Sequence, residues 1–239
     1  MKQRLDVYMT FRKLTPTRSQ AESVIRLGKV TVNGRTVTKP GVFVSERDDV
    51  RLTDTERYVS RAGLKLASVA QMLGVDFRDK TVLDVGSSTG GFTDYALQHG
   101  AVRVHAVDVG TEQLHPSLRG DTRIELHEKT DIRDFGLDKT PDIIVMDVSF
   151  ISLREILPHI ANNLSNKNTQ IVAMLKPQFE AGREQVNKGV IKNDAVRRQI
   201  LKEFEAWAKQ YFVVQDKRDS EVTGAKGNRE RFYLLRTTR

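Results

Sequence analysis

From about residue 60 onwards, short apolar runs alternate with amphipathic stretches. The apolar runs predict seven strands, near residues 81–86, 102–108, 123–127, 142–147, 170–175, 211–216 and 230–236. The amphipathic stretches predict helices, most clearly at 91–99, 151–164 and 194–210. Strands that alternate with helices favour an α/β fold with a mostly parallel sheet covered on both faces. The last two strands lie close together in the sequence, so we expect an antiparallel finish to the sheet.

Residues 1–52 show a different pattern, in which two short helices precede a hairpin. The helices are predicted at 5–9 and 17–25. Asn33-Gly34 stands between two segments of alternating polarity, and this dipeptide is a strong local signal for a hairpin turn. We therefore expect a small α+β domain at this end of the chain.

The chain length accommodates this small domain and a larger one. Residues 53–59 are short and polar, and we interpret them as a linker. The α/β domain would then span residues 60–239 of the 239-residue chain.

Composition and charge narrow the classes of function. No apolar stretch approaches the roughly 18 residues that a membrane-spanning helix needs, and the first residues lack the apolar core of a signal peptide, so we expect no stable membrane association. The absence of cysteine excludes disulfides and thiolate sites and fits the reducing cytoplasm, where we expect the protein. The five histidines are scattered without metal-ligand spacing, so no metal site is predicted.

The net charge of +8 indicates an anionic partner. Within residues 1–52, basic residues outnumber acidic ones by about two to one. A charged surface without a partner is the alternative.

A glycine-rich turn follows the first strand of the larger domain. The turn begins after Asp84 and Gly86, and a second strand ends in Asp108 about twenty residues further on. Such a turn brings backbone N–H groups close to a ligand, and an acidic residue at the next strand end binds ribose hydroxyls. The pair indicates a nucleoside-type cofactor; an ordinary strand–turn–helix without a ligand is the alternative.

The residue types in this turn indicate which kind of cofactor it binds. A nicotinamide site requires a glycine where this chain has Ser88, and a phosphate loop requires Gly-Lys-Ser/Thr where it has Gly90-Gly91-Phe92. An acidic residue two positions before the first glycine is instead typical of an S-adenosylmethionine site.

Four further charged residues occupy positions that a packed core would not select. They are Lys65 in an apolar helix, Asp147 and Lys176 at strand ends, and Glu230 at the start of the last strand. Ligands gather at the carboxyl ends of parallel strands, so we expect Asp84, Asp108, Asp147 and Lys176 to share that edge of the sheet. Two lysines and two acids can deprotonate a weakly acidic hydroxyl. Structural ion pairs or a snorkelling lysine are the alternatives for any one of them.

The first domain resembles the small RNA-binding domain of ribosomal-protein S-four type. The resemblance is carried by Arg4-Leu5-Asp6, Ser19-Gln20-Ala21, Ile25-Arg26-Leu27-Gly28-Lys29-Val30 and Val32-Asn33-Gly34. It implies RNA contacts by Arg4, Arg18, Gln20, Lys29 and Asn33.

The whole chain resembles the hemolysin A (TlyA-type) family, whose members are similar to FtsJ-like ribosomal RNA methyltransferases with an added S-four-type domain. The motifs are Ser60-Arg61-Ala62-Gly63-x-Lys65-Leu66, Asp84-Val85-Gly86-x-Ser88-Thr89-Gly90-Gly91-Phe92-Thr93-Asp94, Asp147-Val148-Ser149-Phe150-Ile151-Ser152 and Leu175-Lys176-Pro177-Gln178-Phe179-Glu180. The resemblance implies a Rossmann-like methyltransferase domain that uses S-adenosylmethionine to methylate a ribose 2′-hydroxyl, of a cytidine, in ribosomal RNA or ribosomal subunits.

The resemblance also implies roles for individual residues. The catalytic tetrad would be Lys65, Asp147, Lys176 and Glu230, although Glu221 lies near the last of these in the sequence. Residues expected to bind the cofactor are Asp84, Gly86, Ser88, Thr89, Gly90, Gly91, Phe92, Asp108, Val109, Asp131 and Asp147. The polar segment 178–188 could form a lid over the target nucleotide.

Two functions of other classes compete with this one. A membrane-active toxin is suggested by the family's hemolysin name, but the sequence carries no pronounced basic amphipathic helix. A non-catalytic RNA-binding factor for ribosome assembly could keep the fold, but it would not need Lys65, Asp147 and Lys176 together.

Overall fold

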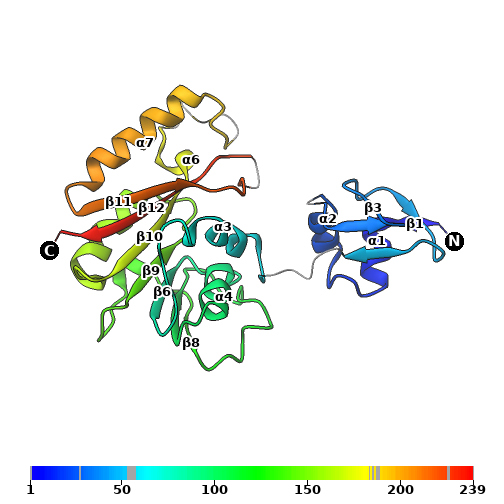
Figure 1. Ribbon diagram of the computed structural model, residues 1–239, viewed down its shortest axis with the longest axis horizontal. Coiled ribbons are helices and arrows are strands. Elements are labelled where there is room, and N and C mark those ends of the chain that lie inside the picture. Colours follow the sequence, from blue (N-terminus) through cyan, green and yellow to red (C-terminus); the bar gives the residue numbers. More distant parts are fainter. Residues whose placement is uncertain are drawn as a thin grey trace. The chain divides into compact units, whose positions relative to one another are not determined.

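A computed structural model describes residues 2–26, 28–52, 58–182, 184, 186, 189–224 and 227–238 (Figure 1). Contacts between Cα atoms divide the chain into two compact units, Met1–Arg57 and Tyr58–Arg239. Residues 53–57 of the predicted linker lie outside the described residues, as do residues 183, 185, 187 and 188 of the predicted lid.

The first unit packs two helices on short strands. The helices are α1 (Leu5–Phe11) and α2 (Arg18–Arg26), and a three-stranded antiparallel sheet has the order β3 (Arg35–Thr36), β2 (Val30–Val32), β5 (Val50–Leu52). Two-residue strands β1 (Gln3–Arg4) and β4 (Phe43–Val44) form a separate antiparallel pair. Buried Leu5, Met9, Ile25 and Val30 form the core.

The predicted hairpin is present, and its turn has a local physical cause. Asn33 and Gly34 both have positive φ, at 52° and 76°, as a type I′ turn requires. The Asn33 amide donates a hydrogen bond to Asp48 and accepts one from the Asp49 N–H, each 2.8 Å long. The side chain thus joins the hairpin to the segment that enters β5.

The second unit is built on a seven-stranded sheet (Figure 1). Five parallel strands, β10 (Gln170–Leu175), β9 (Ile143–Met146), β6 (Thr81–Val85), β7 (Arg103–Val107) and β8 (Ile124–His127), lie in that spatial order. Beyond β10 the sheet ends in antiparallel β12 (Arg231–Thr237) and β11 (Phe212–Asp219).

Helices cover both faces of this sheet, as alternation along the strands dictates. Residues of α3 (Arg61–Ala70) and α4 (Gly91–Gln98) pack with one set of strand side chains, including Val82 and Val145. Residues of α5 (Leu153–His159) and α7 (Asp194–Ala208) pack with the other set, including Leu83 and Ile144. Three short elements complete the unit: η1 (Ile132–Asp134), η2 (Ile160–Leu164) and α6 (Pro177–Glu180).

The predicted fold class is confirmed, and so is the antiparallel finish. Two elements differ in detail from the prediction. The helix expected at 151–164 is α-helical only over Leu153–His159 and continues as the π-helical turn η2. β11 extends to Asp219, and its pairing with β12 shifts register between Val214 and Asp216. Such a bulge adds a residue to one strand, which apolar patterning does not reveal.

Candidate active site

The predicted charged residues meet at one edge of the sheet. Asp84 is the fourth residue of β6, while Asp108, Asp147 and Lys176 directly follow β7, β9 and β10. Glu230 precedes β12, which runs antiparallel to β10, and Arg231 is the register partner of Leu175. The start of β12 therefore lies at the carboxyl edge of the parallel strands, which is where ligands bind in open α/β sheets.

A first buried ion pair joins α3 to the start of β12. Lys65 Nζ lies 2.5 Å from Glu230 Oε2, and the two side chains are only 11% and 3% exposed. A Cβ on Gly224 would lie 2.8 Å from Glu230 Oε1, so the loop before β12 packs closely on this carboxylate. Glu221, the neighbour in sequence, is exposed. Of the two glutamates, the buried Glu230 is the partner of Lys65.

A second ion pair joins the ends of β9 and β10. Lys176 Nζ lies 2.6 Å from Asp147 Oδ1 and donates a 2.6 Å hydrogen bond to Ser149 Oγ. The Lys176 and Asp147 side chains are 10% and 15% exposed. The amine also lies 5.9 Å from the centre of the Phe179 ring. Each contact restricts the amine, so Lys176 is held in place at the strand end.

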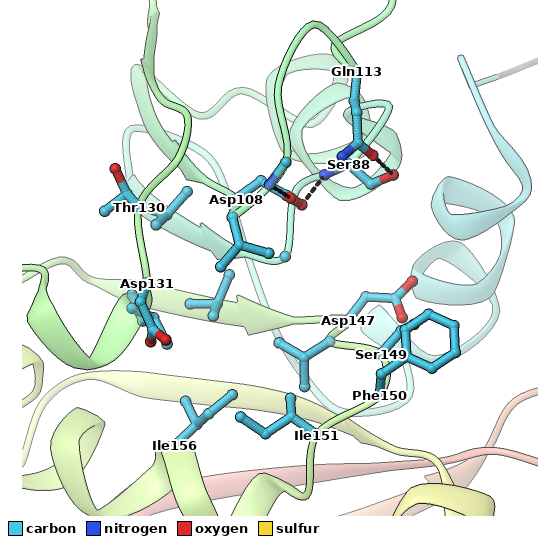
Figure 2. Close-up of a pocket in the computed structure, with 17 residues that line it drawn as sticks. Ser88, Asp108, Gln113, Thr130, Asp131, Asp147, Ser149, Phe150, Ile151 and Ile156 are labelled. Atoms are coloured by element: carbon cyan, nitrogen blue, oxygen red, sulfur yellow. Dashed lines mark hydrogen bonds between the residues drawn. The ribbon is translucent and has the colours of Figure 1, made fainter.

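A cavity of about 450 Å³ opens beside this edge (Figure 2). Six residues that the sequence predicted as cofactor contacts line it: Gly86, Ser88, Asp108, Val109, Asp131 and Asp147. Figure 2 shows the polar side chains of Ser88, Asp108 and Gln113 on one side and Ile151 and Ile156 on the other. The cavity thus offers a polar wall and an apolar wall, as a nucleoside requires.

Sequence reasoning missed several residues that line this cavity. They are Gln113, Thr130, Ser149, Phe150, Ile151 and Ile156, together with Gly110, Ile132, Val148 and the strand residues Val85 and Val107. Most lie in connecting segments rather than in a strand or helix, so apolar patterning gives no signal for them. Ser149, Phe150 and Ile151 do belong to a motif that carried the family resemblance, and that motif was the available signal.

Asp108 organises the polar wall. Its Oδ2 accepts a 2.8 Å hydrogen bond from the Ser88 N–H, and its Oδ1 accepts one of 2.7 Å from the Gly110 N–H. The Ser88 hydroxyl donates a 3.0 Å hydrogen bond to Gln113 Oε1. Each carboxylate oxygen has a second lone pair, so Asp108 can still accept from ligand hydroxyls.

Gly86 is required by the closeness of the next strand. Its φ is +79°, and a Cβ there would lie 3.0 Å from the carbonyl oxygen of Asp147. Any side chain at this position would be strained and would push the end of β9 away.

Asp84 is fully buried beneath the turn. Its Oδ2 accepts a 2.6 Å hydrogen bond from the Thr93 hydroxyl, whereas its Oδ1 has no hydrogen-bond partner among the described residues. Burial, with a smaller contribution from the charge of Asp147, raises the pKa of Asp84 to about 7. Asp84 lines a second cavity, of about 140 Å³, that also contacts Lys176.

The remaining residues of the glycine turn divide into two groups. Thr89 and Phe92 line the smaller cavity. Gly90 and Gly91 line neither cavity; a Cβ on Gly90 would lie 2.6 Å from Leu118 Cδ1, and one on Gly91 would lie 2.9 Å from the Gly63 backbone nitrogen. These two glycines allow close packing of α4, and their contact with a cofactor stays a prediction.

Asp131 has a local structural partner as well as a place in the larger cavity. It accepts a hydrogen bond from the Arg133 N–H at the start of η1, and its Oδ2 lies 2.6 Å from Arg133 Nη2. These hydrogen bonds lower the pKa of Asp131 to about 2. A ligand at Asp131 would therefore meet a carboxylate that Arg133 already holds.

The residues predicted to contact RNA are mostly engaged within the first unit. Arg4 and Arg18 both pair with the buried Asp6, at 2.9 and 3.0 Å. Hydrogen bonding by Arg4, supported by Arg18, holds the pKa of Asp6 well below its usual range. Gln20 and Thr17 exchange hydrogen bonds in a box that caps α2.

The other two predicted contacts differ from each other. The Asn33 amide is used within the hairpin, whereas Lys29 is half-buried beside it. Both arginine side chains on Asp6 remain about half exposed, so they can still reach a phosphate.

Among the residues that the structure describes, no helix is both long and apolar enough to cross a bilayer.

Each of the two units matches the model of a known family. The family model described as "FtsJ-like methyltransferase" matches residues 58–237, and the model described as "S4 domain" matches residues 3–50.

The chain is also similar to individual proteins over almost its full length. It is 41% identical to the "Putative rRNA methyltransferase YqxC" of Bacillus subtilis, across 98% of this chain and 85% of that protein. It is 36% identical to the "23S rRNA (cytidine-2'-O)-methyltransferase TlyA" of Campylobacter jejuni, across 96% and 98%. A solved structure, a putative hemolysin from Streptococcus thermophilus, superposes with a TM-score of 0.77 and 38% identity, across 99% of this chain and 89% of that one.

Proposed function

Because this chain belongs to the FtsJ-like methyltransferase family and has an S4 domain ahead of the methyltransferase domain, we propose that it methylates the ribose 2′-hydroxyl of a cytidine in ribosomal RNA, using S-adenosylmethionine. The observation that carries the proposal is the pair of lysine–carboxylate contacts, Lys65–Glu230 and Lys176–Asp147, at the carboxyl edge of the sheet beside a cofactor-sized cavity. The relative from Campylobacter jejuni is named for the same reaction.

The larger cavity fits a nucleoside cofactor. Its volume of about 450 Å³ lies within the usual range for small-molecule sites. Asp108 would accept from the ribose hydroxyls, while Ile151 and Ile156 would contact the adenine. The unpartnered Oδ1 of Asp84 and the approach that Gly86 permits support a ligand at this turn. When bound, S-adenosylmethionine supplies an electrophilic methyl group on a positively charged sulfur.

Lys176 is the proposed base. The 2′-hydroxyl is a weak acid, so its proton must leave as the oxygen becomes the nucleophile. Lys176 Nζ would accept that proton. It lies at the end of β10 and contacts Asp147 and Ser149, two residues that line both cavities. Asp147 would hold the amine in line.

Lys65 and Glu230 would act in support. Glu230 fixes the Lys65 amine across two elements that are 165 residues apart in sequence. An amine held in this way can orient the ribose by a hydrogen bond, and its positive charge would stabilise the alkoxide that develops.

The first unit is the proposed RNA anchor. It is rich in basic residues, and the side chains of Arg4 and Arg18 are about half exposed while both pair with Asp6. A guanidinium fork suits phosphate contacts that position the protein on RNA.

A methylation assay on bare ribosomal subunits with labelled cofactor tests the proposal. Lys176→Ala should lose about 100-fold or more in turnover, the usual scale for a positioned acid–base group, and should still bind cofactor and RNA. Lys176→Arg should not restore activity, because arginine keeps its proton. Lys167→Ala, at an exposed lysine on the loop before β10, is the matched control and should be fully active.

Two outcomes would contradict parts of this scheme. Near-full methylation by Lys176→Arg would show that the residue is an electrostatic contact and not a base. A wild-type protein that binds the subunits tightly but transfers no methyl group would instead favour a non-catalytic assembly factor.

A further inference from the structure

Three potential metal ligands lie on one face of the two strands at the β8 edge of the sheet. β7 and β8 are parallel, with His105 in register with Glu125 and Val107 in register with His127. Side chains alternate between faces along a strand, so His105, Glu125 and His127 project from the same face. The spacing of histidines along the chain did not predict this group, because only the strand register brings residue 105 beside residues 125 and 127.

The distance from each histidine to the glutamate matches that between neighbouring ligands in a metal site. Each residue offers one ligand atom, and the three atoms lie within 4.8 Å of one another. His105 Nδ1 is 3.3 Å from Glu125 Oε2, and His127 Nε2 is 3.3 Å from Glu125 Oε1. In a tetrahedral zinc site with bonds of about 2.0–2.2 Å, neighbouring ligand atoms are about 3.3–3.5 Å apart.

The histidine nitrogens lie close to the glutamate but form no hydrogen bond with it. Neither His105 Nδ1 nor His127 Nε2 has a hydrogen-bond partner among the described residues, although both atoms are buried. The His105 residue is 9% exposed. Buried polar atoms normally form a hydrogen bond, so an ion between these two nitrogens and the carboxylate would use ligand atoms that the fold leaves without one.

The cluster is open to an ion on one side. The three side chains line a cavity of about 640 Å³ together with the loop of residues 136–140. This cavity shares none of its lining residues with the two cavities of the candidate active site. The cluster is therefore separate from the proposed tetrad.

One contact opposes a cation here. Arg103 Nη1 lies 3.1 Å from Glu125 Oε2, and its positive charge would repel a metal. The Arg103 side chain is 56% exposed, so it can turn into solvent and release the carboxylate.

We propose that His105, Glu125 and His127 bind a divalent transition-metal ion of the zinc class, with a fourth position open to water from the cavity. Two imidazoles and one carboxylate are a donor set that suits Zn²⁺ in preference to Mg²⁺ or Ca²⁺. The ion would join the edge strand β8 to β7 through their side chains, in addition to the backbone ladder.

Titration calorimetry of the chelator-treated, tag-free full chain with ZnCl₂ tests the proposal. We expect one site, and Zn²⁺ should also raise the melting temperature. His105→Gln and His127→Gln should each weaken binding by more than about tenfold, because loss of even an outer contact of a metal site costs that much. His115→Gln, a histidine outside the cluster, is the matched control and should bind as the wild type does.

Arg103→Gln makes the test independent of any folding defect in the histidine variants. It removes the competing charge and keeps all three ligands, so it should bind Zn²⁺ more tightly than the wild type. The proposal is overturned if Arg103→Gln and the wild type both fail to bind Zn²⁺. It is also overturned if folded His105→Gln and His127→Gln bind with unchanged affinity. Because the readout is metal binding, either result leaves the methyltransfer proposal unaffected.

Discussion

At the scale of single residues, Asp84 occupies a position that costs stability. Its pKa of about 7 lies above the ordinary 3.8, so the folded protein binds a proton that the unfolded chain has released between these two values. Stability therefore falls as the pH rises through this window, and the loss is complete only about one pH unit above the folded pKa. A residue kept at such a cost fits the proposed cofactor turn.

Asp84→Asn should consequently stabilise the apoprotein at pH 8 by on the order of 2 kcal/mol, because it removes a buried charge. The gain should shrink at pH 5, where wild-type Asp84 is already protonated. Urea unfolding at both pH values measures the difference. If Asp84→Asn is destabilised equally at pH 5 and pH 8, the charge of the buried Asp84 carboxylate does not lower the stability of the wild type.

Asp108→Ala should weaken cofactor binding. The change removes the hydrogen bonds that hold the Ser88 and Gly110 N–H groups, together with the proposed ribose contact. Each charge-assisted bond contributes about 1.5–3 kcal/mol, so we expect a loss of at least about tenfold in affinity. Calorimetry with S-adenosylmethionine provides the measurement. Unchanged affinity would count against the cavity as the cofactor site.

Gly91→Ala should destabilise the second unit by about 1–3 kcal/mol, a usual cost of overpacking. The added Cβ would lie 2.8 Å from Ala62 Cβ and 2.9 Å from the Gly63 nitrogen, where α4 meets α3. Gly120→Ala is the matched control, since a Cβ there meets nothing within 4 Å. Thermal unfolding of both variants measures the difference. Equal melting temperatures for Gly91→Ala and Gly120→Ala would refute a packing role for Gly91.

At the scale of elements, the apolar runs predicted the strands because a buried strand needs a continuous run of apolar side chains. All seven strands of the large sheet begin within about one residue of their predicted positions. The pair β1 and β4 was not predicted, since two-residue strands are too short to show a period. The π-helical turn η2 was also missed, because its apolar positions look the same as those of the α-helix before it.

The candidate site also contains residues that the sequence predicts and contacts that it does not. Asp84, Asp108, Asp147 and Lys176 could be predicted because each stands at or near the end of an apolar run. Contacts that depend on register or loop geometry could not, and these include the group around His105 and the hydrogen bond between Ser88 and Gln113. The hydrogen bonds of Asn33 could not be predicted either, because their partners Asp48 and Asp49 lie fifteen and sixteen residues away in the sequence.

Asn33→Ala tests that role. Loss of both amide hydrogen bonds and the strain of a left-handed alanine should destabilise the first unit by about 1–2 kcal/mol. Hydrogen exchange of the β2 and β3 amides in the intact protein should rise accordingly. If RNA affinity falls while exchange is unchanged, Asn33 is instead a direct RNA contact.

At the scale of the whole molecule, the two units divide the proposed work. A fragment of residues 58–239 should bind S-adenosylmethionine as the full chain does, because both cavities of the candidate site are lined by residues of that unit alone. Its affinity for ribosomal RNA should be much lower. Binding by the full chain should fall steeply with salt, as phosphate contacts release counterions. Equal RNA affinity with and without residues 1–57 would refute the division.

The strand order also determines when the site can form during protein synthesis. β12 lies between β11 and β10, and Glu230 directly precedes it. A nascent chain that has emerged only as far as α7 contains Lys65, Asp147 and Lys176, but Lys65 lacks its carboxylate partner and β10 lacks a neighbour on one side. The tetrad is therefore complete only after residue 230 has left the ribosome. Under the proposed function, a nascent chain that has not yet exposed Glu230 has the proposed base but lacks the carboxylate that holds Lys65 in place.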